Sequence, residues 1–320
     1  MMRPQRNGNR NPRHSEAGFS LIEVMSALVI LAIAMTAVFA TFISQQKSFT
    51  VQNRVAEMQQ NLRQAVEYMS RDIRLAGYGI PDNVVIPNNI IAAGVTSVRS
   101  IYAKDNTTGP DQVYILYSFD MDANQPSTTL TAAGGTGGSV TVDNTTGFLP
   151  GGGELLLITD GTTADLYQTS AAGGTNLTFG GGYSSGHAKS YPAGSTVAKA
   201  RFDRYFIDNT TDPAHPTLMV DRMGGSAPQP LADDIEDMQL TYAVDLNGND
   251  FIDFGEWTPT PADLSRIRQV RLQFIARTRL PEAGWSETRP ALGNRAAGTA
   301  ADGYRRRIYD IVIDVRNSGV

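Results

Sequence analysis

Hydrophobic and polar positions divide the chain into an apolar stretch, an amphipathic stretch and a long region of short runs. Twenty residues from Val24 to Ile43 carry no charge. That is about 30 Å of helix, which matches the hydrocarbon core of a bilayer. Further along, apolar residues recur at steps of three and four, at Val51, Val55, Met58, Leu62, Val66, Met69 and Ile73. The pattern predicts one long helix that spans a membrane over residues 19–43 and is amphipathic over 44–76.

The polar face of the predicted amphipathic helix is rich in Gln and Asn. This composition is typical of a helix that packs one face on a sheet. Coiled-coil pairing is the alternative interpretation, although the stripe covers few heptads and the polar face lacks paired charges. Gly77, Gly79 and Pro81 follow the stripe. A glycine C-cap and a proline predict that the helix ends there.

Residues 77–320 change to Gly, Thr, Asn and β-branched residues in short runs, which predicts a β-rich globular domain. The fold class is therefore α+β, with the helix packed on an antiparallel sheet. Three glycine clusters, at 134–138, 151–153 and 180–182, bracket short strands and predict hairpin turns. Residues 139–199 are predicted to form a small barrel-like insertion. The predicted strands are 112–119, 139–142, 154–159, 164–169, 196–206, 218–222, 235–244, 268–279 and 307–315.

Composition narrows the classes of function. The 320 residues include 41% hydrophobic residues, enough for a buried core, and no cysteine, which rules out disulfides and thiolate chemistry. The first 18 residues contribute four Arg and one Glu, a net +3, so their removal changes the net charge from −5 to −8. An acidic chain is unsuited to a phosphate backbone, and no nucleic-acid partner is predicted. The basic run Arg305–Arg307 is assigned to an edge strand or sheet face.

Glu23 lies at the start of the apolar stretch and has no nearby cation in the sequence. A buried, unpaired carboxylate in a membrane costs from about 2.5 to more than 10 kcal/mol, so such a residue usually has a functional partner. No Lys or Arg occurs between Arg13 and Lys47. Cleavage between Gly18 and Phe19 would create an α-amino group that could pair with Glu23 of a neighbouring copy. A glutamate that snorkels to the interface of an ordinary anchor is the alternative.

The segment Gly18-Phe19-Ser20-Leu21-Ile22-Glu23-Val24 resembles the prepilin motif of type IV pilins and type II secretion pseudopilins. The resemblance implies that a prepilin peptidase removes residues 1–18, that Phe19 is N-methylated, and that Glu23 pairs with a neighbouring subunit. The run from Arg71 to Tyr78 is similar to the helix end of the PilW class of minor pilins, and also to J-type pseudopilins. The implied partners are other major and minor pilins, through the N-terminal helix, and an inner-membrane assembly platform.

The basic leader, with Arg3, Arg6, Arg10 and Arg13, is expected to stay cytoplasmic. This orientation predicts a single-pass precursor in the inner membrane with a periplasmic C-terminal domain. The resemblance to pilins implies a later location in the pilus at the cell surface. A competing hypothesis is signal-peptidase cleavage after Val38-Phe39-Ala40, which would release a soluble protein.

Residues 245–256 match the spacing of a twelve-residue calcium loop. Asp245, Asn247, Asn249, Phe251, Asp253 and Glu256 fall at the ligand positions, with a backbone carbonyl from Phe251. The departure is Asp250, which occupies the position where such loops place glycine. An acidic hairpin held by Asx-turns is the alternative. A weaker string, Asp120, Asp122 and Asn124, lacks a distal acid.

No motif predicts an enzyme. The only histidines after the leader are His187 and His215, in expected loops, and no serine lies in a nucleophile elbow. The predicted function is a minor type IV pilin, a structural subunit that takes part in pilus assembly. The alternatives are a secretion pseudopilin and a membrane-anchored, calcium-stabilised adhesin or ligand-binding module.

Overall fold

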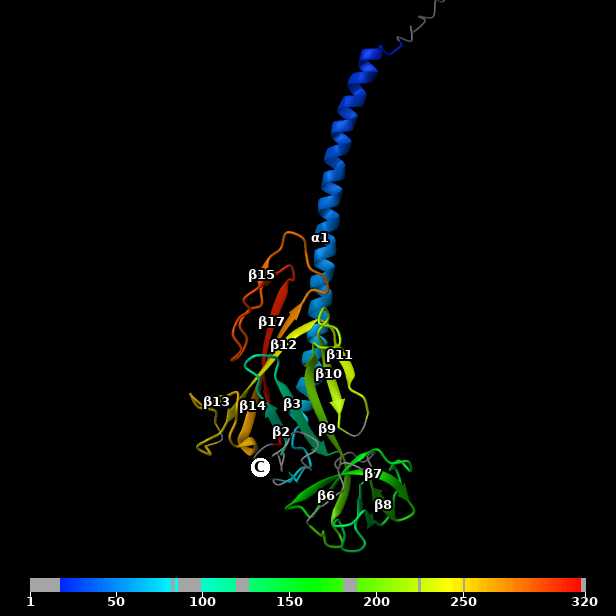
Figure 1. Ribbon diagram of the computed structural model, residues 1–320, viewed down its shortest axis with the longest axis vertical. Coiled ribbons are helices and arrows are strands. Elements are labelled where there is room, and N and C mark those ends of the chain that lie inside the picture. Colours follow the sequence, from blue (N-terminus) through cyan, green and yellow to red (C-terminus); the bar gives the residue numbers. More distant parts are fainter. Residues whose placement is uncertain are drawn as a thin grey trace, which may run out of the picture. The chain divides into compact units, whose positions relative to one another are not determined.

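The computed structural model describes residues 18–81, 84–85, 99–118, 127–180, 189–223, 226–249 and 251–317. The chain divides into an N-terminal unit up to Asn53 and a second unit from Arg54 onward. One helix, α1 (Leu21–Leu75), begins in the first unit and ends in the second (Figure 1). It is long and apolar enough near its N-terminus to cross a membrane. The predicted helix is therefore confirmed, with its start two residues later than expected.

The second half of α1 is held by the apolar stripe. Met58, Leu62, Val66, Met69 and Ile73 are all buried and belong to one cluster with residues of both large sheets. Each such side chain contributes about 1.5–3 kcal/mol when it is fully buried. The stripe therefore packs on sheets of the same chain, as predicted, rather than forming a coiled coil.

Within the described ranges, eleven strands form the larger sheet. Its main path runs β11 (Gln229–Ala232), β10 (Thr217–Arg222), β9 (Thr196–Asp208), β6 (Leu155–Thr159), β7 (Ala164–Gly173), β8 (Asn176–Phe179) and β5 (Ser139–Thr141). The other members are β1 (Val84–Val85), β2 (Ile101–Lys104), β3 (Gln112–Ser118) and β4 (Ser127–Thr129). All pairs are antiparallel except β1 with β7.

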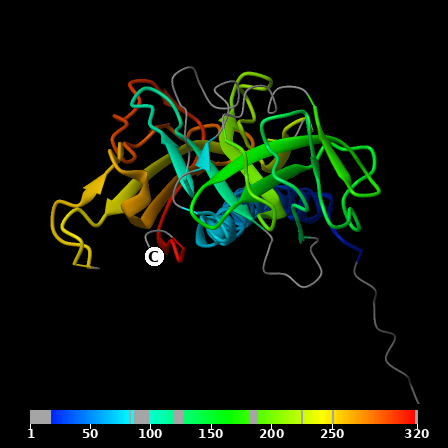
Figure 2. The same ribbon diagram turned by 90° about the horizontal axis from the view of Figure 1, so that it is seen from below.

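Four strands form the second sheet, in the order β13 (Trp257–Thr258), β12 (Ile235–Val244), β14 (Ile267–Arg277) and β17 (Arg306–Asp314). A short 3-10 helix, η2 (Leu264–Arg266), precedes β14, and β15 (Glu287–Thr288) pairs with β16 (Ala301–Asp302). Seen from below, the four-stranded sheet and the β6–β8 strands lie to the two sides of the C-terminal end of α1 (Figure 2). The basic run falls at the start of β17, as predicted for an edge strand.

Asp111 connects the two large sheets. It comes just before β3, and its carboxylate accepts hydrogen bonds from the backbone N–H of Leu240 in β12 and of Asn106, both at 2.8 Å. Its own N–H donates to the carbonyl of Met238 at 2.8 Å. The side chain is buried, and this burial raises the pKa of Asp111 to about 7.

Residues 127–199 have a hydrophobic cluster of their own, around Tyr167, Tyr191 and Phe179. β9 pairs with β4 and β6 through its first residues and with β3 and β10 through its last. An isolated bridge between Leu130 and Val142 joins the ends of β4 and β5. Because β9 belongs to the whole sheet, these pairings do not separate an independent body. The barrel-like insertion stays a prediction.

Candidate functional site

The N-terminal end of α1 carries the residues of the predicted processing and assembly site. Gly18, Phe19 and Ser20 precede the helix, and Glu23 lies in its first turn. The carbonyl of Ser20 accepts hydrogen bonds from the N–H groups of Glu23 at 3.0 Å and Val24 at 3.2 Å. The Ser20 hydroxyl also accepts from the Glu23 N–H at 3.3 Å. Ser20 thus caps the helix, and the Glu23 carboxylate lies at the positive end of the helix dipole.

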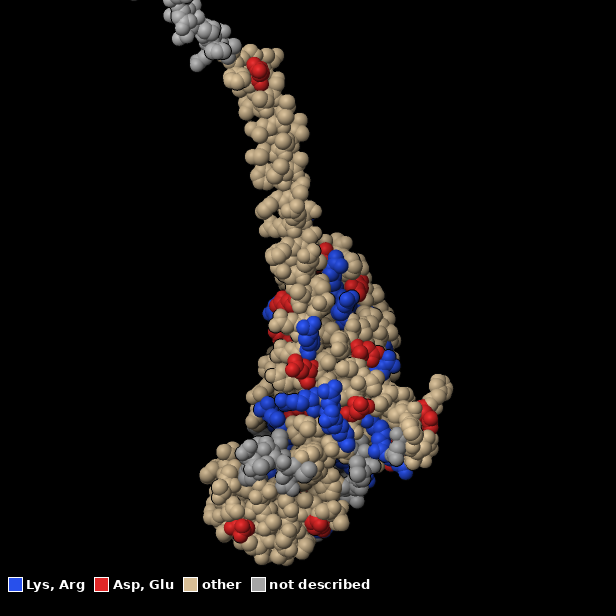
Figure 3. Space-filling model, turned by 180° about the vertical axis from the view of Figure 1, so that it is seen from behind, with Lys and Arg blue, Asp and Glu red and all other residues tan. Residues whose placement is uncertain are grey.

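No described residue supplies a counter-ion for Glu23. Every described residue from 18 to 50 is exposed, and Phe19 is 81% exposed. The next described cation along the helix is Lys47, about 36 Å away at 1.5 Å per residue. Figure 3 shows the same distribution, with Lys and Arg gathered on the second unit and the N-terminal half of the helix almost without charge. The described part of the chain therefore leaves the Glu23 carboxylate without a counter-ion.

Hydroxyl groups in the apolar part of α1 are satisfied within the helix. Ser26 donates to the carbonyl of Ile22 at 2.7 Å, and Thr36 donates to the carbonyl of Ala32 at 2.8 Å. Thr41 makes the equivalent bond to Ala37 at 3.0 Å. A hydroxyl that bonds to the preceding turn can enter hydrocarbon without an unsatisfied donor. Glu23 is therefore the group in this segment whose polarity is left unmatched.

At the other end of α1, Asp72 joins the helix to the larger sheet. Its carboxylate is buried and accepts a short hydrogen bond from the phenol of Tyr205 in β9, and Arg71 Nε lies 3.2 Å from it. Burial, followed by the charge of Asp72, raises the pKa of the Tyr205 phenol, so the phenol remains a donor. Asp203 lies two residues before Tyr205 in β9, and burial raises its pKa to about 6.

Gly77 accounts for the sharp end of the helix. It has φ +79°, and an added Cβ would lie 2.8 Å from the Asn317 carbonyl oxygen and 2.9 Å from Ser100 Cβ. Its N–H donates to the carbonyl of Leu116 in β3 at 2.9 Å. The run from Arg71 to Tyr78 is therefore a structural junction between helix and sheet.

The predicted calcium loop brings its residues together. Asp245 and Glu256 are buried, and the Glu256 carboxylate accepts the N–H groups of Leu246 at 3.0 Å and Asp253 at 2.7 Å. Asp245 accepts the Gly248 N–H at 2.7 Å. The Asp253 carboxylate accepts the side-chain amides of Asn247 at 2.8 Å and Asn249 at 2.9 Å.

Asx-turns hold the same loop: Asn247 Oδ1 accepts the Asn249 N–H at 3.0 Å, and Asn249 Oδ1 accepts the Phe251 N–H at 2.8 Å. Among the described residues, no group of three His, Asp or Glu side chains is arranged to hold a metal ion. The donor set is nevertheless the hard-oxygen set that calcium prefers. Asp250 and the string Asp120, Asp122 and Asn124 lie outside the described residues. Calcium binding therefore stays a prediction.

Sequence reasoning did not identify Tyr205 as the partner of Asp72. The two residues are 133 positions apart, and the packing of α1 on the larger sheet brings them into contact. Of the two histidines expected in loops, His215 lies in a loop, with its Nδ1 2.8 Å from the Asp234 carboxylate. His187 lies outside the described residues.

Two family models match the chain. The model for Type IV Pilus-assembly protein W matches residues 204–317, and the model for the prokaryotic N-terminal methylation motif matches residues 13–39. Among solved structures, the chain is similar to a type IV-like pilin from Thermus thermophilus, with 11% sequence identity and a TM-score of 0.36. That match covers 81% of this chain and 97% of the other. No curated protein matches the chain.

Proposed function

We propose that this chain is a structural subunit that is activated by removal of its leader. The proposal starts from the two family-model matches, which indicate a minor type IV pilin of the PilW class. In this proposal a prepilin peptidase cuts after Gly18 and the new terminus, Phe19, is N-methylated. The helix then joins other pilins in the filament or its assembly complex. The match to a pilus-assembly family favours a pilus over a secretion pseudopilus.

One observation carries the proposal: Glu23 lies in the first turn of an uncharged, membrane-length helix with no cation beside it among the described residues. An unpaired carboxylate at this depth costs several kcal/mol. Pairing with the α-amino group of Phe19 on a neighbouring subunit removes much of that cost, and only on assembly. The unpaired acid thus favours the assembled state over the stored one.

The same reasoning gives an orientation. The basic leader stays in the cytoplasm by the positive-inside rule, so the β-rich unit lies in the periplasm before assembly and on the pilus surface afterwards. The inner-membrane assembly platform is the proposed intermediate partner. The proposed role is structural rather than catalytic, in keeping with the two family-model matches, which are to a pilus-assembly protein and to an N-terminal methylation motif.

The experiment replaces Glu23 with Ala or Lys in the full chain and measures its amount in membranes and in purified pili. We expect unchanged membrane levels and at least a tenfold loss from pili. Glu57→Ala is the matched control, because Glu57 is an exposed glutamate on the same helix outside the apolar stretch. Wild-type levels of the Glu23 variants in pili would refute the assembly role.

Calcium is a second, separate proposal. It is supported by the ligand spacing and by the burial of Asp245 and Glu256 at the two ends of one loop. A bound calcium ion would take the place of the N–H donors at these two carboxylates and would stabilise the loop between β12 and β13.

A further inference from the structure

β17 is an unusually open edge of the four-stranded sheet. It pairs along its nine residues with β14 and with no other described strand, and its register has no bulge. The strands at the other ends of the two sheets are short: β13 has two residues, β5 has three, and β11 has four, including Pro230. Shortness and proline are two of the usual protections of a sheet edge, and β17 has neither, although it carries charged side chains such as Asp310 and Asp314.

The backbone of β17 presents a row of donors and acceptors at this edge. Val315 N–H donates to the Arg268 carbonyl at 2.8 Å, and Thr278 N–H donates to the Arg305 carbonyl at 2.9 Å. In an antiparallel pair, the backbone N–H and C=O groups of every second residue point toward the partner strand. The odd-numbered residues between these two points therefore form hydrogen bonds with β14. The N–H and C=O groups of Ile308, Asp310, Val312 and Asp314 therefore point away from the sheet. They form a line of about 20 Å.

Apolar side chains accompany this open backbone. Ile308 is 47% exposed, Tyr309 is 39% exposed and Val312 is 48% exposed, all within five positions. By contrast, Arg306 at the start of β17 is occupied by ion pairs with Glu236 and Asp302, both at 2.6 Å. The open part of the edge thus combines unpaired backbone with exposed hydrophobic surface, the combination that another strand would cover.

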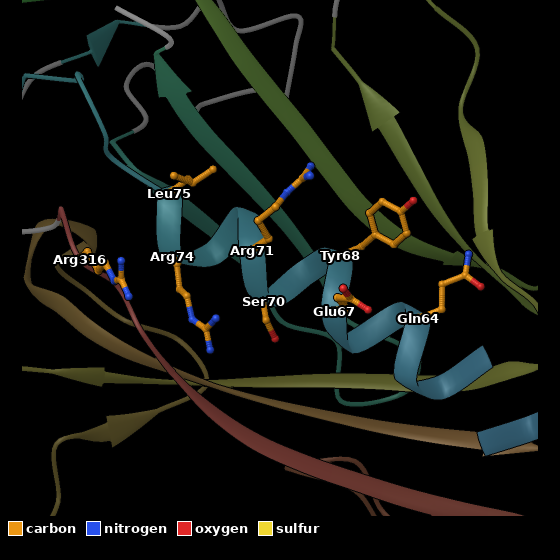
Figure 4. A pocket seen from close by; sticks show the side chains of 8 residues that line it. All are labelled: Gln64, Glu67, Tyr68, Ser70, Arg71, Arg74, Leu75 and Arg316. Atoms are coloured by element: carbon orange, nitrogen blue, oxygen red, sulfur yellow. The ribbon is translucent and has the colours of Figure 1, made fainter. Parts of the chain in front are cut away.

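A groove of about 910 Å³ lies at the C-terminal end of β17. Its lining includes Glu67, Ser70 and Arg74 of α1 and Arg316, two residues beyond β17. Figure 4 shows Arg74 and Arg316 extending side by side from α1 and from the segment after β17. Ser70 is 6% exposed, and its hydroxyl has no hydrogen-bond partner in the described structure. Neither Arg74 nor Arg316 forms an ion pair with another described residue. Two guanidinium groups and a free hydroxyl are suited to a carboxylate.

We propose that the free edge of β17 accepts an extended segment of a different protein chain as an added β-strand. The incoming segment is apolar opposite Ile308 and Val312, and it carries a carboxylate at the end that meets Arg74 and Arg316. Backbone hydrogen bonds supply the affinity, and the alternating side chains supply the specificity.

A second copy of this chain fits the edge poorly. Two copies could pair their β17 edges in antiparallel fashion, with the outward-facing residues opposite one another. In two of the four central registers, Asp310 then lies opposite Asp310 or Asp314 of the second copy. The other two registers place Asp310 opposite Ile308 or Val312. Like charges directly opposite one another destabilise a sheet, and so does an aspartate against an apolar side chain. Arg271 of β14 pairs with Asp310, with its Nε 2.9 Å from Oδ1, so it offsets part of the repulsion between charges and leaves the mismatch with Ile308 or Val312. The charge pattern therefore favours a different chain.

Site-specific photocrosslinking in cells that produce the full chain tests the proposal. The photoreactive residue p-benzoylphenylalanine replaces Val312. As a control it replaces Leu149, which is 55% exposed and lies between β5 and β6 of the larger sheet. We expect Val312 to crosslink to one segment of another protein with at least fivefold higher yield than Leu149, and mass spectrometry of the crosslinked peptide to locate a carboxylate in that segment.

Two substitutions distinguish an added strand from a general apolar contact. Ile308→Pro removes an N–H that does not face β14, and we expect it to lower the Val312 yield at least fivefold. Ile308→Thr keeps that N–H and should change the yield less than twofold. If the proline variant fails to accumulate, Arg74→Glu with Arg316→Glu, which leaves β17 intact, should lower the yield at least threefold. Three outcomes would overturn the proposal. The first is a Val312 yield equal to that of the Leu149 control, and the second is a crosslink to a second copy of this chain. The third is a Val312 yield that is unaffected by Ile308→Pro or by the Arg74→Glu plus Arg316→Glu variant.

Discussion

The junction between α1 and the larger sheet gives a prediction that can be worked out in detail. Tyr205→Phe removes the phenol that donates to the buried Asp72 carboxylate. A hydrogen bond to a charged group contributes roughly 1.5–3 kcal/mol. The carboxylate would keep Arg71, whose side chain is 60% exposed, and the attraction of the Arg201 charge. We therefore expect the free energy of unfolding to fall by roughly 1.5–3 kcal/mol, a loss of about 3–12 °C in Tm for a domain of this size.

The assay is thermal unfolding of the full chain in detergent micelles, followed by near-UV circular dichroism. Tyr68→Phe is the matched control, because Tyr68 lies on the same helix, is 43% exposed and should change stability by less than about 0.5 kcal/mol. Asp72→Ala leaves the buried phenol without an acceptor and should be at least as destabilising as Tyr205→Phe. In the double variant the losses should be less than additive by about 1 kcal/mol or more. Additive losses, or a Tyr205→Phe variant as stable as wild type, would refute the reasoning.

Three further predictions concern a glycine, a buried acid and the metal loop. Gly77→Ala should destabilise the chain by roughly 1–3 kcal/mol more than Gly161→Ala in the same thermal assay, because both have positive φ but only Gly77 has atoms within 3 Å of an added Cβ. Burial raises the pKa of Asp111 to about 7, so its protonated form is favoured in the folded state, and stability should fall as pH rises from about 4 to 7. Asp111→Asn should flatten that dependence, and an unchanged slope would contradict it. Millimolar calcium should raise the Tm of the wild-type chain but not of the Asp245→Ala plus Glu256→Ala variant, and no shift in wild type would remove the calcium proposal.

The helix and most strands could be predicted because their signals are local. The steps of three and four from Met58 to Ile73 identify the buried face of α1, and alternation with flanking turns identifies strands such as β12 and β14 within two residues at each end. Short strands such as β2 and β8 were not predicted, since four residues without a strong pattern look like a loop.

The candidate sites divide in the same way. Glu23 and the loop at 245–256 are visible in sequence because their residues lie close together along the chain. The contact between Asp72 and Tyr205 depends on how α1 packs on the larger sheet, and the open edge of β17 depends on which strands become neighbours. Strand order is set by packing between distant segments, and one sequence carries no local signal for it.

The central claim is that a new α-amino group at Phe19 supplies the charge that Glu23 lacks. Intact-mass measurement of the protein recovered from membranes and pili, combined with sequencing of its N-terminus, tests this most directly. The account predicts a chain that begins at Phe19 and carries one added methyl group on its terminal nitrogen. A chain that begins at Met1, or at Thr41 after cleavage within the apolar helix, would contradict it.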